Sequence, residues 1–216
     1  MSRRISQLRK LAEGRGTGEL GNYKPWTYED EVNSEGTCNS YPDPIHGRSV
    51  QLLSQGELRA YLKTRFDEQV WDIREQFPML DVKRAYRLAS LCDYLYPYEN
   101  GERVILTTDM LIYRKDGSRI ACSCKPNVEI LTEKDKKRQW IEGMYWLEEG
   151  ISWTLIETDK ISKTLALNIW DAFEYYDEKD IHDKASIAKH LVATKKVTVN
   201  METPINWVEL AKELGL

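Results

Sequence analysis

The chain has 216 residues and a formal net charge of −4, with 41% hydrophobic and 31% charged residues. This length fits one domain with a smaller appendage or two small domains, and the hydrophobic content is enough for a packed core. No apolar run approaches the roughly 20 residues of a membrane helix, and the N-terminus lacks the apolar stretch of a secretory signal. We therefore expect a cytoplasmic protein with no membrane partner.

The cysteines and histidines show no metal-binding or disulfide pattern. Cys38, Cys92, Cys122 and Cys124 form no Cys-x-x-Cys pair, and the three histidines are isolated in the sequence. A zinc site and a disulfide framework are therefore not expected. Cys122 and Cys124 alternate in a strand-like run, which predicts small buried apolar side chains.

The N-terminal segment is basic although the whole chain is acidic. Two acids, Glu13 and Glu19, stand in residues 1–24 against the cations Arg3, Arg4, Arg9, Lys10, Arg15 and Lys24. A net negative charge does not exclude local phosphate contacts, and an arm of this kind can follow a DNA backbone. A frayed, solvated terminus explains the same composition equally well. Arg15 and Lys24 are kept as candidate DNA contacts.

The first quarter of the chain contains few regular elements. Apolar residues at helical spacing over residues 5–12 predict a short helix. The glycine-rich run at residues 14–21 is not a phosphate-binding loop, because no strand precedes it and no Gly-Lys-Ser/Thr follows. Residues 27–49 are polar and contain two prolines, which predicts an irregular segment.

From residue 54 the pattern becomes that of a mixed α/β domain. The expected elements are a helix opened by the capping box Ser54-x-x-Glu57, a half-buried strand over 71–78, a helix over 82–92, strands over 104–113 and 120–125, a helix from Glu133 to Gly150, and a strand over 151–158. In the helix from Glu133, Trp140, Met144 and Leu147 share one face and are expected in the core. This order predicts a first domain over residues 1–161.

Beyond residue 161 the chain is mostly helical. Helices are expected over 165–175, 187–191 and 207–214, with a short strand at 196–199 between the last two. Residues 162–216 are therefore expected to form a small, winged-helix-like module.

The hairpin formed by the strands at 104–113 and 120–125 carries three polar residues of interest. Asp109 lies on its outgoing strand, and Ser123 and Lys125 lie on its return strand. A two-residue turn would pair Asp109 with Cys124 and place it on the other face of the sheet. A three-residue turn over 116–118 pairs Asp109 with Lys125 instead, and all three polar side chains then share one face. We predict the three-residue turn.

An acid opposite a lysine, with a second acid on a nearby helix, suits phosphodiester hydrolysis. Mg²⁺ prefers oxygen ligands, so two carboxylates and a main-chain carbonyl suffice to hold it. The metal polarises the phosphate and lowers the pKa of an attacking water, while a lysine orients that water and balances the developing charge. Two other interpretations stay open. Asp109 and Lys125 can form an ordinary surface ion pair, and Glu57 can simply complete the capping box of its helix.

Several segments, in the same order and with similar spacing, resemble the TnsA endonucleases. They are Gly14-Arg-Gly-Thr-Gly18 with Asn22-Tyr-Lys-Pro-Trp26, Leu52-Leu-Ser-Gln-Gly-Glu57-Leu, Trp71-Asp-Ile-Arg-Glu-Gln-Phe-Pro78, Thr108-Asp109-Met-Leu, Cys124-Lys125-Pro126, and Ile151-Ser-Trp153 through Ile161. The match runs from about Gly14 to Ile161. The last third of the chain matches only loosely.

The resemblance implies a restriction-endonuclease-like mixed sheet flanked by helices. It implies Glu57, Asp109 and Lys125 as catalytic residues, with Mg²⁺, or alternatively Mn²⁺, held by Glu57, Asp109 and the Cys124 carbonyl. The implied reaction is hydrolysis of the 5′ strand at transposon ends. The implied partners are DNA, an integrase-like transposase subunit that acts on the 3′ strand, and an ATP-dependent regulator that docks on the C-terminal region.

Ser123 departs from the family pattern, because the family usually carries glutamine at this position. A serine is shorter and neutral, so a metal contact there would run through water. This departure motivates one alternative, a catalytically weakened subunit that binds DNA or assists assembly. A stand-alone restriction or repair nuclease on the same core is another.

Four further residues are candidate DNA contacts. Arg74 and Gln76 alternate with the apolar residues of their strand and are candidates for the active cleft. Lys136 and Lys137 lie on the helix that follows the hairpin, where they either flank a DNA phosphate or form part of a solvated face.

Overall fold

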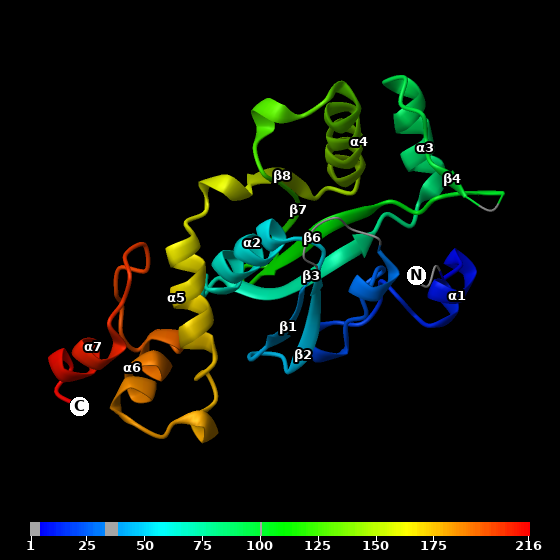
Figure 1. Ribbon diagram of the computed structural model, residues 1–216. Coiled ribbons are helices and arrows are strands. Elements are labelled where there is room, and N and C mark those ends of the chain that lie inside the picture. The colour runs from blue at the N-terminus through cyan, green and yellow to red at the C-terminus, as the bar shows by residue number, and fades with distance from the viewer. Residues whose placement is uncertain (1–4, 33–38, 100) are drawn as a thin grey trace.

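The computed structural model describes residues 5–32, 39–99 and 101–216 (Figure 1). Cys38, Arg3 and Arg4, which the sequence analysis considered, lie outside these ranges. The mixed α/β architecture expected from the sequence is confirmed, with helices packed on both faces of a twisted sheet.

The N-terminal arm, residues 5–32, runs along the edge of this sheet. Its regular elements are α1 (Gln7–Ala12) and the short 3₁₀ helices η1 (Leu20–Asn22) and η2 (Glu29–Glu31). The arm is fastened to β3 (Val70–Pro78): the Tyr23 hydroxyl donates to the Glu75 carbonyl at 2.9 Å, and Trp26 N–H donates to the Gln76 carbonyl at 3.1 Å. The exposed edge of β3 is thereby covered, which prevents pairing with a foreign strand.

Replacing Gly18 with alanine is expected to lower the free energy of unfolding by about 1–3 kcal/mol, because residue 18 has a φ of +85° and a Cβ there would meet the Asn22 carbonyl. Gly117→Ala is the matched control, since Gly117 also has a φ of +85° but nothing lies within 4 Å of an added Cβ. Denaturant unfolding of both variants measures the difference. Equal losses would show that the close approach to Asn22 contributes nothing.

Residues 27–49, expected to be irregular, contain a strand and the start of another. β1 (Asn39–Asp43) and β2 (Arg48–Leu52) form an antiparallel hairpin that packs beside β3. The prediction was wrong here because the apolar residues that pin the hairpin, Tyr41 and Val50, are isolated among polar neighbours in the sequence. Their partners come from distant elements, so no local periodicity reveals them.

The main sheet has the strand order β3-β6-β7-β8. The other strands of this sheet are β6 (Thr107–Arg114), β7 (Arg119–Lys125) and β8 (Ser152–Glu157). The β3–β6 and β6–β7 pairs are antiparallel, and β8 runs parallel to β7. A small separate pair, β4 (Tyr98–Glu99) with β5 (Glu102–Arg103), precedes β6.

The register of the β6–β7 hairpin differs from the predicted one. Arg114 N–H donates to the Ser118 carbonyl at 3.0 Å, so the turn occupies residues 115–117 rather than 116–118. The strands accordingly pair Met110 with Cys122, and continuing that register places Ser123, not Lys125, opposite Asp109. The turn has the predicted length but starts one residue earlier, because Gly117 takes the left-handed position at the end of the loop.

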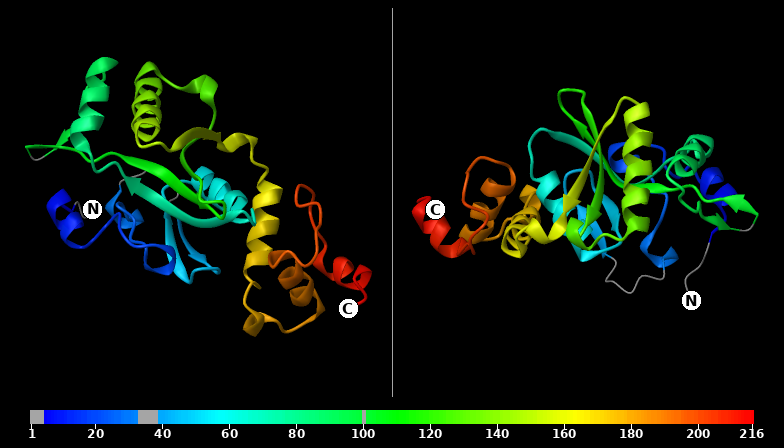
Figure 2. Two further views of the ribbon diagram at one scale, coloured as in Figure 1. Left: turned by 180° about the vertical axis from the view of Figure 1, so that it is seen from behind. Right: turned by 90° about the horizontal axis from the view of Figure 1, so that it is seen from above.

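Helices cover both faces of the sheet (Figures 1 and 2). On one face lies α2 (Gln55–Arg65), and on the other lie α3 (Val82–Leu91) and α4 (Glu133–Glu148), preceded by η3 (Val128–Ile130). The predicted N-caps Ser54 and Thr132 are both confirmed, since each side chain accepts a main-chain N–H from the first turn of its helix. Cys122 and Cys124 are buried against the α2 face, as expected.

The expected core stripe of α4 is wrong at Trp140 and Leu147, whereas Met144 is half-buried against the core. Trp140 and Leu147 are 40% and 64% exposed, and the helix instead buries the face that carries Ile141, Tyr145 and Trp146. Both faces contain large apolar residues at helical spacing, so periodicity alone did not separate them. The buried face is the one with more aromatic surface to remove from water.

Residues 162–216 contain α5 (Lys163–Phe173), α6 (Lys184–Ala193) and α7 (Trp207–Glu213), with η4 (Thr158–Lys160) before them and η5 (Glu178–Asp180) between α5 and α6. The strand expected at 196–199 is wrong: these described residues form an irregular connection. Helix α5 packs on α2, and one hydrophobic cluster joins the two helices to the sheet. Within the described residues, every helix is too short or too polar to cross a membrane.

Candidate active site

Asp109 lies where β6 and β7 separate. Regular pairing between the strands ends at Met110 and Cys122, just before Asp109 is reached. Beyond that point a side chain replaces the main-chain acceptor: Asp109 Oδ2 accepts the Cys124 N–H at 2.6 Å. The Asp109 carboxylate is therefore anchored by Cys124 in the fork between the separating strands. The next residue after Cys124 is Lys125, which ends β7.

Glu57 lies in the first turn of α2, next to this fork. Its Oε2 accepts Leu53 N–H at 2.9 Å and Gln76 Nε2 at 3.2 Å, and its Oε1 accepts the Ser54 hydroxyl at 3.1 Å. Ser54 caps the helix, but the Glu57 carboxylate does not close the expected capping box, because it accepts the N–H of Leu53 and the hydroxyl of Ser54. The same carboxylate, 9% exposed, also contributes to a shared electrostatic environment with Asp109.

The two carboxylates and Lys125 lie within electrostatic range of one another. Burial is the largest cause that raises the pKa of Asp109, and the negative charges of Glu57 and Glu142 raise it further. Burial likewise raises the pKa of Glu57. The Lys125 charge opposes both shifts. Close carboxylates that repel each other in a partly dry site are the arrangement that a divalent cation relieves.

Glu142 is an acidic residue of this region that the sequence analysis missed. It projects from α4 and is 2% exposed. Its Oε1 accepts the Ser123 hydroxyl at 2.5 Å and also the Thr108 hydroxyl, and Arg138 Nη1 lies 3.3 Å from its Oε2. These donors satisfy the buried carboxylate. The helical spacing of Arg138 and Glu142 was a usable signal, since both lie on the buried side of α4.

Ser123 belongs to the Glu142 group and not to the group around Asp109. Its side chain is 2% exposed, and its hydroxyl donates to Glu142. The register found in the hairpin puts Ser123 opposite Asp109 without bringing the hydroxyl to that carboxylate. The structure therefore places Glu57, Asp109 and Lys125 within electrostatic range of one another, and it bonds Ser123 to Glu142.

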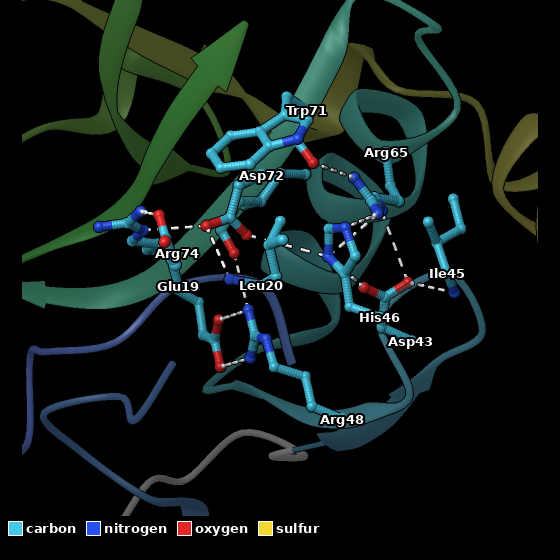
Figure 3. A network of polar contacts seen from close by, with 12 residues as sticks. Glu19, Leu20, Asp43, Ile45, His46, Arg48, Arg65, Trp71, Asp72 and Arg74 are labelled. Atoms are coloured by element: carbon cyan, nitrogen blue, oxygen red, sulfur yellow. Dashed lines mark hydrogen bonds and ion pairs between the residues drawn. The ribbon is translucent and has the colours of Figure 1, made fainter. Parts of the chain in front are cut away.

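The edge of the sheet at β3 is built on buried charges (Figure 3). Asp72 accepts Leu20 N–H at 3.1 Å and Arg74 Nε at 2.9 Å, and His46 Nδ1 lies 3.9 Å from its Oδ1. On the other side, Glu75 forms a two-pronged pair with Arg48, with N–O distances of 2.7 and 2.6 Å. We expected β3 to bury its apolar side chains and expose its polar ones in alternation. This expectation is wrong, because polar residues of β3 are buried against the arm and the β1–β2 hairpin.

The candidate DNA contacts separate into buried and exposed residues. Arg15 is 5% exposed and forms ion pairs with Glu13 and Glu31. Arg74 is similarly engaged with Asp72 and stacks over Tyr113. These contacts hold Arg15 and Arg74 within the protein, and a DNA contact by either residue stays a prediction.

The remaining candidate DNA contacts differ in the exposure of their side chains and in their partners within the protein. Lys24 is exposed, and its Nζ donates to the Glu13 carbonyl at 3.1 Å. The Lys136 side chain is 56% exposed and pairs with Glu133, whereas Lys137 is half-buried and donates to the Asp93 carbonyl. Gln76 is buried and reaches Glu57.

The donor set fits a hard cation such as Mg²⁺. Glu57 and Asp109 offer carboxylate oxygens, and among the described residues neither carboxylate forms an ion pair with a cationic side chain. No three His, Cys, Asp or Glu side chains of the described chain converge as a ligand group. Mg²⁺ does not require such a group, since it binds through one or two carboxylates and keeps several waters.

The class of this α/β domain is restriction-endonuclease-like: its sheet carries an acid at the fork of a hairpin and a lysine at the end of the return strand, and a second acid lies at the start of a flanking helix. The comparisons agree with this class. Residues 67–158 match the family model described as TnsA-like endonuclease N terminal. The transposon Tn7 transposition protein TnsA of Escherichia coli is 31% identical over 167 residues, which cover 76% of this chain and 61% of that protein.

The chain is therefore similar to the TnsA-like endonucleases, through the domain at residues 67–158 and through the Tn7 relative. It spans about three fifths of the length of the Tn7 relative. The resemblance drawn from the sequence motifs is confirmed, and so is the expected fold.

Proposed function

We propose that this chain is a divalent-metal-dependent DNA endonuclease that cuts the 5′ strand at transposon ends during transposition. The observation that carries the proposal is the gathering of Glu57, Asp109 and Lys125 at the fork of β6 and β7. The similarity to the TnsA-like endonucleases supports the nuclease class, and the Tn7 relative is by its name a transposition protein.

In this proposal Glu57 and Asp109 hold Mg²⁺, or alternatively Mn²⁺, together with the Cys124 main-chain carbonyl. Once bound, the metal polarises the scissile phosphate and lowers the pKa of an attacking water. The Cys124 N–H keeps Asp109 oriented, and the Ser54, Leu53 and Gln76 donors keep Glu57 oriented. Lys125 positions the attacking water and balances negative charge on the non-bridging oxygens as the bond to the leaving oxygen breaks.

Ser123 acts in this site through Glu142. Its hydroxyl is engaged by that carboxylate, so any contact with the metal runs through water. Lys24 and Lys136, which are exposed, are the proposed contacts to the DNA backbone, with Lys137 next to Lys136 in α4.

The partners of the proposed reaction are DNA, an integrase-like transposase subunit and an ATP-dependent regulator. We assign the nuclease to residues 1–161 and regulator docking to residues 162–216. Helices α5–α7 support the second assignment by presenting apolar residues to solvent, among them Leu167 and Val208, which are 65% and 56% exposed.

Replacing Asp109 with alanine is expected to reduce nicking of transposon-end DNA to background, because the anchored ligand in the fork is lost. The assay contains Mg²⁺ and the transposase partner, and compares wild type, Asp109→Ala and the exposed-acid control Asp177→Ala. Cleavage by Asp109→Ala at the wild-type rate would remove the catalytic assignment. Robust cutting by the chain alone on DNA without transposon ends would favour a stand-alone nuclease.

The engagement of Ser123 with Glu142 favours a second candidate, a weakened subunit that serves DNA binding or assembly. It predicts that the wild-type protein supports transposase assembly on end DNA while its own nicking is already at background. The same assay separates the two functions, because only the nuclease gives a difference between wild type and Asp109→Ala.

A further inference from the structure

Gln76 has a backbone conformation that is unusual for its place in a strand. Its φ is +47°, a left-handed value that L-residues other than glycine rarely adopt and that costs on the order of 1–3 kcal/mol. The β3–β6 ladder is interrupted at this residue: Glu75 pairs with Met110 and Phe77 with Thr108, but Gln76 does not pair with Asp109, which lies opposite. The irregularity therefore falls directly across from the proposed metal ligand in the fork.

The consequence of this kink is that β3 changes faces. In a regular strand, residues four apart lie on the same face. Ile73 belongs to the hydrophobic cluster that includes α2, whereas Phe77 packs on Trp146 in the cluster that includes α4. Arg74 and Gln76 separate in the same way, since Arg74 stacks over Tyr113 while Gln76 reaches Glu57 on α2. Only the left-handed residue lets the Gln76 side chain reach that face.

The kink is held in place from both sides. The Gln76 carbonyl accepts Trp26 N–H at 3.1 Å from the N-terminal arm, and Phe77 stacks on Tyr23 of the same arm. The carboxamide is 2% exposed, and its Nε2 donates to Glu57 Oε2 at 3.2 Å. Strain of this kind persists only where the surrounding structure over-determines it, and it concentrates at functional sites.

We propose that Gln76 is a positioning residue, whose strained backbone presents a carboxamide that orients Glu57 toward a divalent cation. The inference rests on the proposed function, because it takes Glu57 and Asp109 as the metal ligands. Oε2 of Glu57 already accepts Leu53 N–H and Gln76 Nε2, so Oε1, which accepts the Ser54 hydroxyl, is the oxygen that remains to face the ion. Partners of this kind typically contribute about 10–100-fold to metal affinity.

The test is a Mn²⁺ titration of the full chain by calorimetry, with thermal melting as a second readout. Gln76→Met keeps the length of the side chain but removes the donor, and Gln76→Gly removes both the donor and the strain. We expect about 10–100-fold weaker Mn²⁺ binding in both variants, with Gln76→Gly melting at or above the temperature of Gln76→Met. A purely structural glutamine would change the melting temperature and leave the Mn²⁺ affinity unchanged.

Asp109→Ala identifies the relevant binding event, which it is expected to abolish. Wild-type affinity in both Gln76 variants would overturn the inference while the proposed function stands. Absence of an Asp109-dependent Mn²⁺ site in the wild-type protein would overturn the proposed function, and this inference with it.

Discussion

Replacing Lys125 with alanine is expected to lower the rate of strand cleavage by about 10²–10³-fold or more, while the protein stays folded. Lys125 ends β7 beside the fork, and its charge acts on both Glu57 and Asp109. Among the described residues it forms no ion pair, so its removal breaks no structural contact of that kind. Its charge is instead available to the developing negative charge on phosphate.

Cleavage of end DNA and a thermal melt, measured on the same preparation, check this expectation. Lys212→Ala is the matched control, because the Lys212 side chain is 65% exposed on α7 and pairs with Glu209 of its own helix. A collapse of the melting transition in Lys125→Ala would mean that the lysine is structural. Cleavage equal to that of Lys212→Ala would exclude a role in the reaction.

Replacing Arg48 with methionine is expected to lower the free energy of unfolding by about 3–5 kcal/mol. Arg48 and Glu75 are 6% and 0% exposed, and they form a two-pronged pair between β2 and β3. Without the guanidinium, the Glu75 carboxylate stays buried with Gln51 N–H as its remaining donor. The folded state of Arg48→Met is destabilised because it contains a buried negative charge without a cationic partner.

A double variant separates this cause from simple loss of packing. Arg48→Met combined with Glu75→Met removes the stranded charge, and apolar replacement of a buried pair is often close to neutral. Denaturant unfolding of the single and double variants is therefore expected to show the double variant as the more stable of the two. If the single variant were the more stable, the electrostatic explanation would be wrong.

Local signals in the sequence predicted most of the main domain. Helix caps such as Ser54 and Thr132 satisfy N–H groups of the first turn by short-range bonds, so they identify their helices without tertiary information. The β6–β7 hairpin was visible from its turn residues. The three residues proposed for catalysis came from the resemblance to the family, since the pattern of an acid and a lysine on a hairpin is common.

The parts that escaped prediction depend on distant partners. The hairpin register was missed because Gly117 was placed in the middle of the turn, whereas its left-handed φ of +85° belongs to the last turn residue. Buried polar residues on β3, such as Asp72 and Glu75, find their partners in the arm and in β2. Glu142 was missed for the same reason, because its donors Thr108 and Ser123 lie on other elements.

The packing of α5 on α2 makes the C-terminal helices part of the structural support of the proposed metal site. Helix α2, which carries Glu57, lies between the sheet and α5, and residues such as Leu62 and Ile169 share one cluster across that junction. A protein that binds α5–α7 would therefore act, through α5, on α2, the helix that carries one of the two proposed metal ligands. Binding of a partner to the C-terminal helices would then change the position of Glu57 directly, through the packing of α5 on α2.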